Sequence, residues 1–336
     1  MNHYSLLLPT LLPEGLRDVM HPDAAHERYV INTILDRFSL FGYEQVSPPL
    51  MEYETSLLSG KGEVYHTQSF RVMDAQSQTM MALRADITTQ IERIAGRLLQ
   101  HNNIARLSYT GNILRSTAPH GLASGRQLRQ TGIEMIGDKA DPLEILTASL
   151  EALDTLKVTQ LVITLSVAGL LEQLCSHVTP QMRKAIYNKD SDALDNSISS
   201  YHDIVALLKH DDEQYSQAVK EALQPLHNIK HQIETHFENA IVIVDPLDTE
   251  NFPYHHGICF TLLDSNTKQE IGRGGSYDYA EDRKGCGLTL YMEKLMQSDI
   301  CYPNKEKTHI ISDATPYAQA RQLREQSIKT IKEIVS

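Results

Sequence analysis

The chain has 336 residues, 41% of them hydrophobic, and a formal net charge of −12, a length that suits one large domain with an insertion or two domains. The excess of carboxylates argues against a broad nucleic-acid interface, which needs clustered Lys and Arg. No apolar run reaches the roughly 18 residues of a membrane helix, and the first residues lack the basic region and cleavage site of a signal peptide. We therefore expect a cytoplasmic protein.

The four cysteines, Cys175, Cys259, Cys286 and Cys301, form no C-x-x-C pair. A zinc site would need paired ligands, and a secreted disulfide framework would need a denser set. We expect reduced, mostly buried thiols, no metal and no cofactor.

The first part of the chain predicts helices alternating with short strands. Residues 23–41 predict an amphipathic helix with Asp23 as its N-cap and Gly42 as its stop. The segment FGYEQVSPPLMEYE predicts a strand that ends at the two prolines, and residues 65–84 a hairpin. Two further helices are predicted over 86–100 and over 141–156, the second capped by Asp141 with Pro142 at its first position.

Residues 106–137 predict two strands joined by a polar loop. The first strand alternates Leu107, Tyr109 and, after a break at Gly111, Ile113, and it ends at Arg115. The return strand carries Gln130, Gly132 and Glu134 two residues apart and therefore on one face.

The second half predicts a strand over 159–168, a polar helical stretch over 169–238, and strands over 240–245, 254–263 and 285–291. A last strand and a helix from Pro316 follow, with Ala320, Leu323, Ser327 and Ile331 lining one helix face. The pattern predicts an α+β fold, an antiparallel sheet flanked by helices and not a doubly wound one. We expect a core of residues 1–168 and 239–300, a helical insertion of 169–238 and a C-terminal strand–helix segment of 301–336.

Three motifs fail as sites. Gly60-Lys61-Gly62 lacks the rest of a P-loop and is interpreted as a solvated loop. GRGGSYD at 272–278 has no βαβ unit around it, so its glycines predict a tight turn, ending at Tyr277, or a close approach to a ligand. His255 and His256 are neighbours on a predicted strand and face opposite ways, so they cannot share a metal; we expect one buried and hydrogen-bonded and one exposed.

The polar residues that remain suit a small zwitterion. LRADIT places Arg84, Asp86 and Thr88 two apart before a helix, where Asp86 could hold an ammonium group or only cap the helix. An Arg can bind the carboxylate of a ligand, acidic side chains can bind its ammonium group, and Gln or Tyr can hydrogen-bond a polar side chain. The set is Asp86, Arg115, Gln130, Glu134 and Tyr277. The alternative is that Arg115 and Glu134 pair across the hairpin and the pocket binds nothing.

Seven segments in register resemble histidyl-tRNA synthetase, a class II synthetase, and more closely its non-catalytic relatives, the regulatory subunits of ATP phosphoribosyltransferase. They are LLPEGLRDV, FGYEQVSPPLMEYE (motif 1, 41–54), LRADIT, Arg106–Gly137 (motif 2), YHHGICF, GGSYD and GLTLYMEKL (motif 3), and they cover residues 11–296. The resemblance implies a candidate histidine pocket of Asp86, Thr88, Arg115, Gln130, Glu134, Tyr254 and Tyr277.

Departures from the synthetase pattern fall at positions that handle ATP. Glu250, Ser276 and Ala118 stand where the family has Arg, Lys294 stands where motif 3 ends in Arg, and Thr117 stands where motif 2 has Glu. Lysine keeps a charge but loses the guanidinium fork, and a carboxylate repels phosphate. We interpret this as a polar pocket whose phosphate-binding groups are lost.

The resemblance therefore implies a subunit without chemistry of its own. It implies a homodimer formed through motif 1, within a hetero-octamer, that activates a short-form catalytic subunit and mediates feedback inhibition by histidine in histidine biosynthesis. Histidine would bind in the relict pocket or at a subunit interface, and residues 301–336 would be a truncated remnant of the anticodon-binding domain. The alternatives are a free-standing enzyme that activates histidine or a related amino acid, and a module that couples histidine supply to another partner.

Overall fold

The computed structural model describes residues 12–117, 125–197, 200–249, 252, 254–280, 283–302, 308–312, 315–326 and 328–332. The chain divides into two compact units, Met1–Ile300 and Cys301–Ser336, and each is described by itself.

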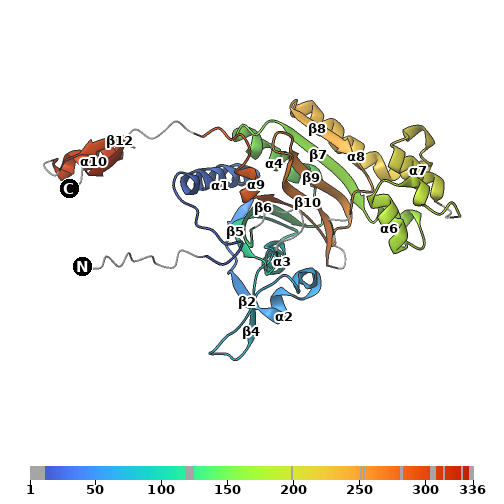
Figure 1. Ribbon diagram of the computed structural model, residues 1–336, viewed down its shortest axis with the longest axis horizontal. Helices are drawn as coiled ribbons and strands as arrows, with labels where there is room; N and C mark the ends of the chain where they lie inside the picture. Colours follow the sequence, from blue (N-terminus) through green and yellow to red (C-terminus); the bar gives the residue numbers. More distant parts are fainter. Residues whose placement is uncertain are drawn as a thin grey trace, which may run out of the picture. The chain divides into compact units, whose positions relative to one another are not determined.

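The larger unit is organised by one eight-stranded sheet with the strand order β1-β5-β6-β11-β10-β9-β7-β8 (Figure 1). Its strands are β1 (Glu44–Val46), β5 (Ile104–Leu114), β6 (Gln127–Gly137), β7 (Leu161–Ala168), β8 (Ala240–Val244), β9 (Gly257–Asp264), β10 (Gln269–Ala280) and β11 (Arg283–Tyr291). The inner pairs are antiparallel, and only the outermost pairs, β1 with β5 and β7 with β8, are parallel. The predicted α+β class, with a largely antiparallel sheet, is confirmed.

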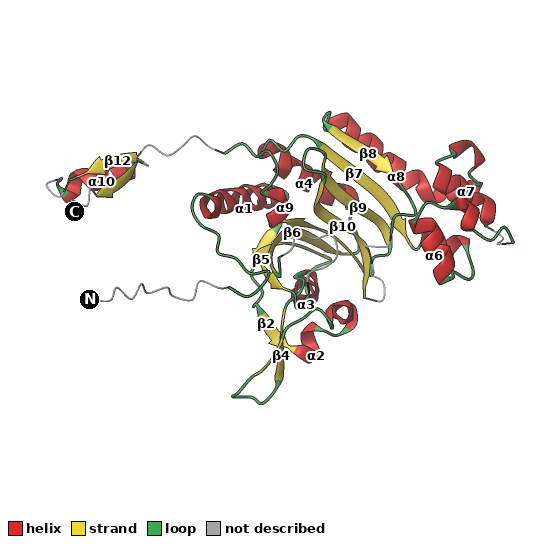
Figure 2. Cartoon of the chain, viewed as in Figure 1, coloured by secondary structure: helices red, strands yellow, loops and turns green. Residues whose placement is uncertain are grey.

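Helices cover both faces of this sheet, as Figure 2 shows. On one face lie α1 (Asp23–Leu40) and α4 (Pro142–Thr155), which pack against each other. On the other lies α3 (Thr88–Leu98), whose Ile91 packs with Leu107 and Tyr109 of β5 in a buried cluster. The predicted cap of α4 is confirmed, because Asp141 Oδ1 accepts a hydrogen bond from the Leu143 amide at 2.9 Å. The apolar faces of these helices thus fix α3 against the strands that carry the candidate pocket.

A three-stranded sheet, ordered β2-β4-β3, lies beside this core. It consists of β2 (Met51–Tyr53), β3 (Arg71–Met73) and β4 (Met80–Leu83), with the short helices α2 (Glu54–Leu57) and η1 (Gly60–Tyr65) between them. Arg84, only 5% exposed, ties the two sheets together: its Nη1 donates to the Pro48 carbonyl at 2.9 Å and its Nε to that of Asn112 at 2.7 Å.

The structure corrects two local predictions in this part of the chain and adds a strand to a third. The strand predicted in motif 1 ends before Pro48 and Pro49, as expected, and a second strand, β2, follows the prolines in the other sheet. Asp23 is the first residue of α1, and its cap position is Pro22, with no side-chain hydrogen bond. Gly111 does not break β5, which is continuous through it.

Between β7 and β8 the described residues form helices and no strand, as predicted. The helices are α5 (Leu170–Leu174), α6 (Pro180–Tyr187), η2 (Ser191–Ala193), α7 (Tyr201–Lys209), η3 (Asp212–Gln214) and α8 (Gln217–His236). The longest, α8, packs on β8 and β7 and buries five apolar residues along one face.

The glycine-rich segment 272–278 is not a turn but the middle of β10. Glycine has a low strand propensity, so the sequence pattern hides this strand. The glycines allow neighbouring backbones to approach closely: a Cβ on Gly274 would lie 2.1 Å from the carbonyl oxygen of Gly287 in β11. The predicted close approach exists, but it is to a neighbouring strand.

After β11, α9 (Met292–Leu295) ends the ordered elements of the larger unit. The C-terminal unit contains β12 (Thr308–Ile311), α10 (Tyr317–Glu325) and β13 (Lys329–Lys332), with β12 and β13 parallel. The predicted helix face was wrong at its end, because Ile331 belongs to β13; Ser327 lies outside the described residues. Among the described helices, none has the length and apolar character needed to cross a membrane.

Candidate functional site

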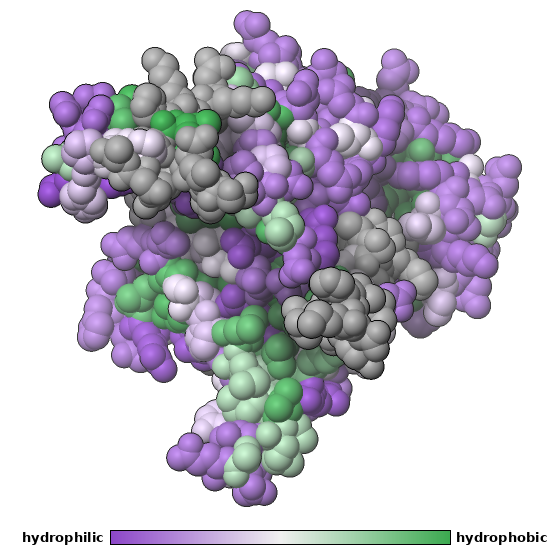
Figure 3. All heavy atoms as spheres, turned by 60° about the vertical axis from the view of Figure 1, so that its left-hand side comes forward, coloured by the Kyte–Doolittle hydropathy of each residue, from purple (hydrophilic) through white to green (hydrophobic). Residues whose placement is uncertain are grey.

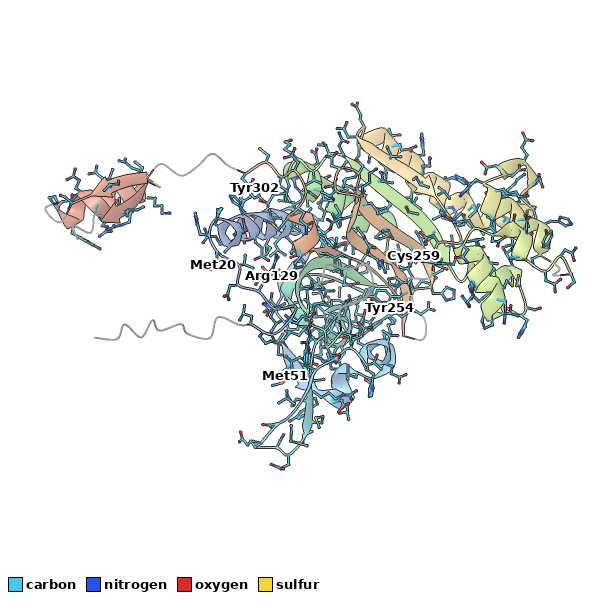
Figure 4. All side chains as sticks on the ribbon, viewed as in Figure 1. Met20, Met51, Arg129, Tyr254, Cys259 and Tyr302 are labelled. Atoms are coloured by element: carbon cyan, nitrogen blue, oxygen red, sulfur yellow. The ribbon has the colours of Figure 1, made fainter. Side chains whose placement is uncertain are left out.

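Five of the seven predicted pocket residues come together in one buried hydrogen-bonded cluster beside α3. They are Asp86, Thr88, Gln130, Glu134 and Tyr277, each at most 8% exposed. They come from the start of α3, from β6 and from β10, segments far apart in the sequence. The other two, Arg115 and Tyr254, lie beside the cluster; Figure 4 labels Tyr254 just before β9 and Cys259 within that strand.

Glu134 is the centre of the cluster. Its two carboxylate oxygens accept hydrogen bonds from the Thr88 hydroxyl at 3.0 Å and from the Tyr277 hydroxyl at 2.8 Å. Glu134 and Tyr277 stand on β6 and β10, the strands on either side of β11. They meet because their partners on β11 are glycines: Glu134 pairs with Gly287, and Tyr277 pairs with Gly285.

Asp86 and Gln130 form the second half of the network. The Gln130 amide donates to Asp86 Oδ2 at 2.8 Å, and its carbonyl oxygen accepts from the Ile87 amide at 3.1 Å. Asp86 Oδ1 accepts from the Thr88 amide at 2.9 Å. Asp86 therefore binds a backbone amide at the start of α3 and the side chain of Gln130; a role in holding an ammonium group stays a prediction.

Arg115 does not pair with Glu134. It is 8% exposed, and its Nε donates to the Ala85 carbonyl at 3.1 Å. Its guanidinium carbon lies 5.8 Å from the ring centroid of Tyr65, a cation–π distance. The alternative of a simple ion pair across the hairpin is not what the structure shows.

Aromatic rings close the remaining side. Tyr254 stacks on His255 with ring centroids 4.4 Å apart, meets Tyr277 edge-on at 6.3 Å and is hydrogen-bonded to Tyr65. Two of the rings, Tyr65 and His255, were not predicted as part of the site. The pocket thus joins a polar floor on the sheet to an aromatic wall.

Burial controls the electrostatics. Desolvation raises the pKa of Glu134 from 4.5 to about 8, although the hydrogen bonds from Tyr277 and Thr88 oppose this rise. Desolvation likewise raises the pKa of Glu92, against the lowering effect of nearby Lys61. A carboxyl with a pKa near 8 is largely protonated at neutral pH, so Glu134 can serve as a hydrogen-bond donor or acceptor.

Lys61 was predicted to lie in a solvated loop, and this is wrong. Its ammonium lies 2.6 Å from Glu92 Oε1 and 3.8 Å from the centroid of the Tyr277 ring. Its side chain is only 20% exposed. For Glu92 a sequence signal existed: it lies one helical turn after Thr88 on the same face of α3. For Lys61 there was none, because the contact depends on the three-dimensional path of η1.

The expected loss of phosphate-binding groups needs one addition, which concerns Arg273 on β10. Ser276 and Tyr277 are neighbours on a strand and face opposite ways, and the Ser276 hydroxyl bonds to Cys286. The residue that shares the face of Tyr277 is Arg273, which is bound by both oxygens of Glu270 at 2.8 and 2.6 Å. Lys294 lies on α9 and Thr117 is exposed; Glu250 and Ala118 lie outside the described residues.

A cleft of about 770 Å³ opens on the other side of His255, between the helices after β7 and the segment after β8. It is lined by Leu171, Arg183, Lys184, Asp245, Asp248, Phe252 and His255 among others, and by none of the five clustered residues. His255 and His256 precede β9 and are not on a strand, which corrects that prediction. His256 is exposed, as one of the pair was expected to be, but the Nδ1 atom of His255 is buried without a hydrogen-bond partner.

We predict that Gly287→Ala destabilises the protein through Glu134. A Cβ at this position would lie 2.0 Å from Glu134 Oε2, an overlap expected to cost about 1–3 kcal/mol. Glu134→Ala removes the overlapping atoms, so the double variant should lose less stability than the sum of the two single changes. Urea unfolding of all four proteins measures this coupling, and strict additivity would show that the two residues do not meet.

We predict that Glu134→Gln flattens the dependence of stability on pH. The folded-state pKa is raised, so between pH 4.5 and about 8 the native protein holds a proton that the unfolded chain releases. The parent should therefore lose stability as pH rises through this window, at no more than about 1.4 kcal/mol per pH unit from this group. Urea unfolding at several pH values gives both profiles, and parallel profiles would contradict the raised pKa.

Comparison with known proteins agrees with this architecture. The family model described as histidyl-tRNA synthetase matches residues 15–295. Among solved structures, one titled as an ATP phosphoribosyltransferase regulatory subunit/histidyl-tRNA synthetase from Bacillus halodurans C has a TM-score of 0.79 at 18% identity, covering 98% of this chain and 93% of that one. Histidyl-tRNA synthetase from Nostoc sp. PCC 7120 has a TM-score of 0.72 at 15% identity, covering 97% and 86%. These two likenesses show the class II synthetase-like fold.

Sequence relatives narrow the family further. A protein of Paramagnetospirillum magneticum named ATP phosphoribosyltransferase regulatory subunit is 34% identical over 96% of this chain and 90% of its own length. A protein of the same name from Rhodospirillum centenum is 31% identical over 96% and 88%. The chain therefore belongs to the ATP phosphoribosyltransferase regulatory subunit family, within the histidyl-tRNA synthetase-like fold.

Proposed function

We propose that this chain is a cytoplasmic, non-catalytic regulatory subunit that binds a short-form ATP phosphoribosyltransferase catalytic subunit and activates it. In this proposal it also mediates feedback inhibition of the complex by histidine, at the first step of histidine biosynthesis. The observation that carries the proposal is the similarity along nearly the whole chain to proteins named as such regulatory subunits. Activation without chemistry is an allosteric effect, in which differential binding shifts the equilibrium between two states of the partner.

The buried cluster is our candidate for the histidine pocket. Glu134, protonated or not, can hydrogen-bond an imidazole nitrogen; the neighbouring acidic side chains suit an ammonium group, and Arg115 suits a carboxylate. These groups converge from α3, β5, β6 and β10 and are at most 8% exposed, as expected of a site that recognises a small polar molecule. A site at the interface with the catalytic subunit is the rival location.

The lack of catalysis is supported by the groups around this pocket. Lys294 offers a point charge where a guanidinium fork would hold phosphate, and Arg273, on the pocket face of β10, is already engaged by Glu270. The rival proposal, an enzyme that activates histidine or a related amino acid, is favoured only by the retained pocket and the synthetase-like fold.

We predict that adding this chain to a short-form catalytic subunit raises the rate of phosphoribosyl-ATP formation, and that histidine lowers the rate of the mixture. The matched control is the catalytic subunit alone in both conditions. Equal rates with and without this chain would remove the proposal. In a parallel assay of histidine-dependent pyrophosphate exchange with ATP, we expect no signal; exchange at a synthetase-like rate would favour the enzyme instead.

We further propose a homodimer formed through the motif 1 region, within a larger assembly such as a hetero-octamer. Exposed apolar side chains gather on one face of the small sheet: Met51 and Tyr53 of β2 are 40% and 50% exposed, and Val72 of β3, which the strand register places on the same face, is 48% exposed. Figure 3 shows an apolar area, coloured green, above the hydrophilic lower tip of the molecule. Contiguous exposed apolar patches mark interaction sites.

In the same proposal, residues 169–238 form an inserted helical subdomain of the 1–168 and 239–300 core.

We predict that Val72→Asp shifts the protein from dimer to monomer, because in a dimer formed through this patch the new charge would be buried. Sedimentation velocity measures the change. The matched control is Ile241→Asp, which places the same charge on β8 at a residue 59% exposed and should leave the dimer intact. A parent that sediments as a monomer, or an unchanged Val72→Asp dimer, would locate the contact elsewhere or exclude it.

A further inference from the structure

Lys61 lies in the one position of the cluster where a cation is bound by both a carboxylate and an aromatic ring. Its ammonium contacts Glu92 at 2.6 Å and lies 3.8 Å from the Tyr277 ring centroid. A carboxylate beside the face of an aromatic ring is also how proteins bind the ammonium groups of ligands. The side chain of Lys61 therefore occupies a site whose chemistry suits a ligand amine.

The five clustered residues already have hydrogen-bond partners within the chain. Glu134 is held by Thr88 and Tyr277, and Asp86 is held by Gln130. A ligand amine that reaches Glu92 and the ring of Tyr277 must replace the group already there. That group is the ammonium of Lys61.

Lys61 is also easier to displace than the members of the cluster. Glu134 and Tyr277 stand on central strands of the sheet and are 2% and 1% exposed. Lys61 stands on the six-residue η1, and 20% of its long, flexible side chain is exposed. Gly62, next to it, holds the backbone against the Leu57 carbonyl, where a Cβ would lie 2.2 Å from the oxygen. The backbone at Gly62 thus packs tightly, while part of the Lys61 side chain is open to solvent.

We propose that Lys61 is an intramolecular competitor for the amine of the ligand and so sets the affinity and charge preference of this pocket. The ligand class is a small imidazole that carries a primary amine. This inference rests on the proposed histidine pocket and adds the residue that controls entry into it. A tethered competitor weakens apparent binding by the fraction of time for which it fills the site.

The test is calorimetric titration of the isolated full-length chain with histidine, with histamine and with imidazolepropionate, which lacks the amine. We expect Lys61→Met to bind histidine and histamine about tenfold more tightly than the parent, since Glu92 and the Tyr277 ring become free for the ligand amine. Imidazolepropionate should change less than about twofold. Lys61→Arg, which keeps the cation, should resemble the parent.

Two controls keep the outcome interpretable. Thermal unfolding shows whether Lys61→Met is folded, and Lys61→Gln serves as a second variant if it is not. The double variant Lys61→Met/Glu92→Gln should lose most of the gain in histidine affinity, because the Glu92 carboxylate that would bind the histidine amine is gone. Equal gains for all three ligands would indicate a steric effect and would overturn the proposal.

Failure here is distinguishable from failure of the proposed function. Unchanged or weaker histidine binding by Lys61→Met, or no binding by either protein, overturns the role of Lys61 while activation of the catalytic subunit can still be measured. Conversely, a chain that leaves the catalytic subunit unaffected can still show the tenfold difference between parent and Lys61→Met.

Discussion

Glu134 is only 2% exposed. A carboxyl group that is buried so deeply is tolerated only if its hydrogen bonds are satisfied. Two hydroxyl groups meet this condition, one from the start of α3 and one from β10. The Tyr277 hydroxyl reaches the carboxyl group because β11, the strand between Glu134 and Tyr277, carries glycine at positions 285 and 287. The low side-chain volume of β11 is therefore the constraint on which the geometry of the pocket depends.

The side chains around Glu134 fall into two groups: a floor on central strands and α3, and a roof on shorter segments. The floor belongs to central strands and to α3, which packs through Ile91 against the core. Arg84 holds the small sheet to the large one through backbone carbonyls, so the segment that carries η1 starts from a fixed base. The roof consists of side chains that reach in from η1 and from the segment before β9.

Much of the pocket could be predicted from sequence because its residues obey local rules. Gln130 and Glu134 share a strand face through their spacing, and Asp141 caps α4 through a standard motif. The missed parts depend on long-range register. Strand β10 is rich in glycine and has no local strand signal; its order is imposed by β9 and β11. The course of β10 alone decides that Arg273, and not Ser276, shares the face of Tyr277. Lys61 reaches the site because η1 brings its ammonium over the Tyr277 ring.

The aromatic wall has a practical consequence for spectroscopy. The chain has 15 tyrosines and no tryptophan, so its near-ultraviolet circular dichroism and its intrinsic fluorescence come mainly from phenol rings. Tyr65, Tyr254 and Tyr277 stand together, the first two partly exposed and Tyr277 buried, and Tyr109 lies buried with its hydroxyl 2.7 Å from that of Thr289. The Tyr277 hydroxyl lies 2.8 Å from the carboxyl group of Glu134, so the ultraviolet signals of these rings report on the surroundings of Glu134.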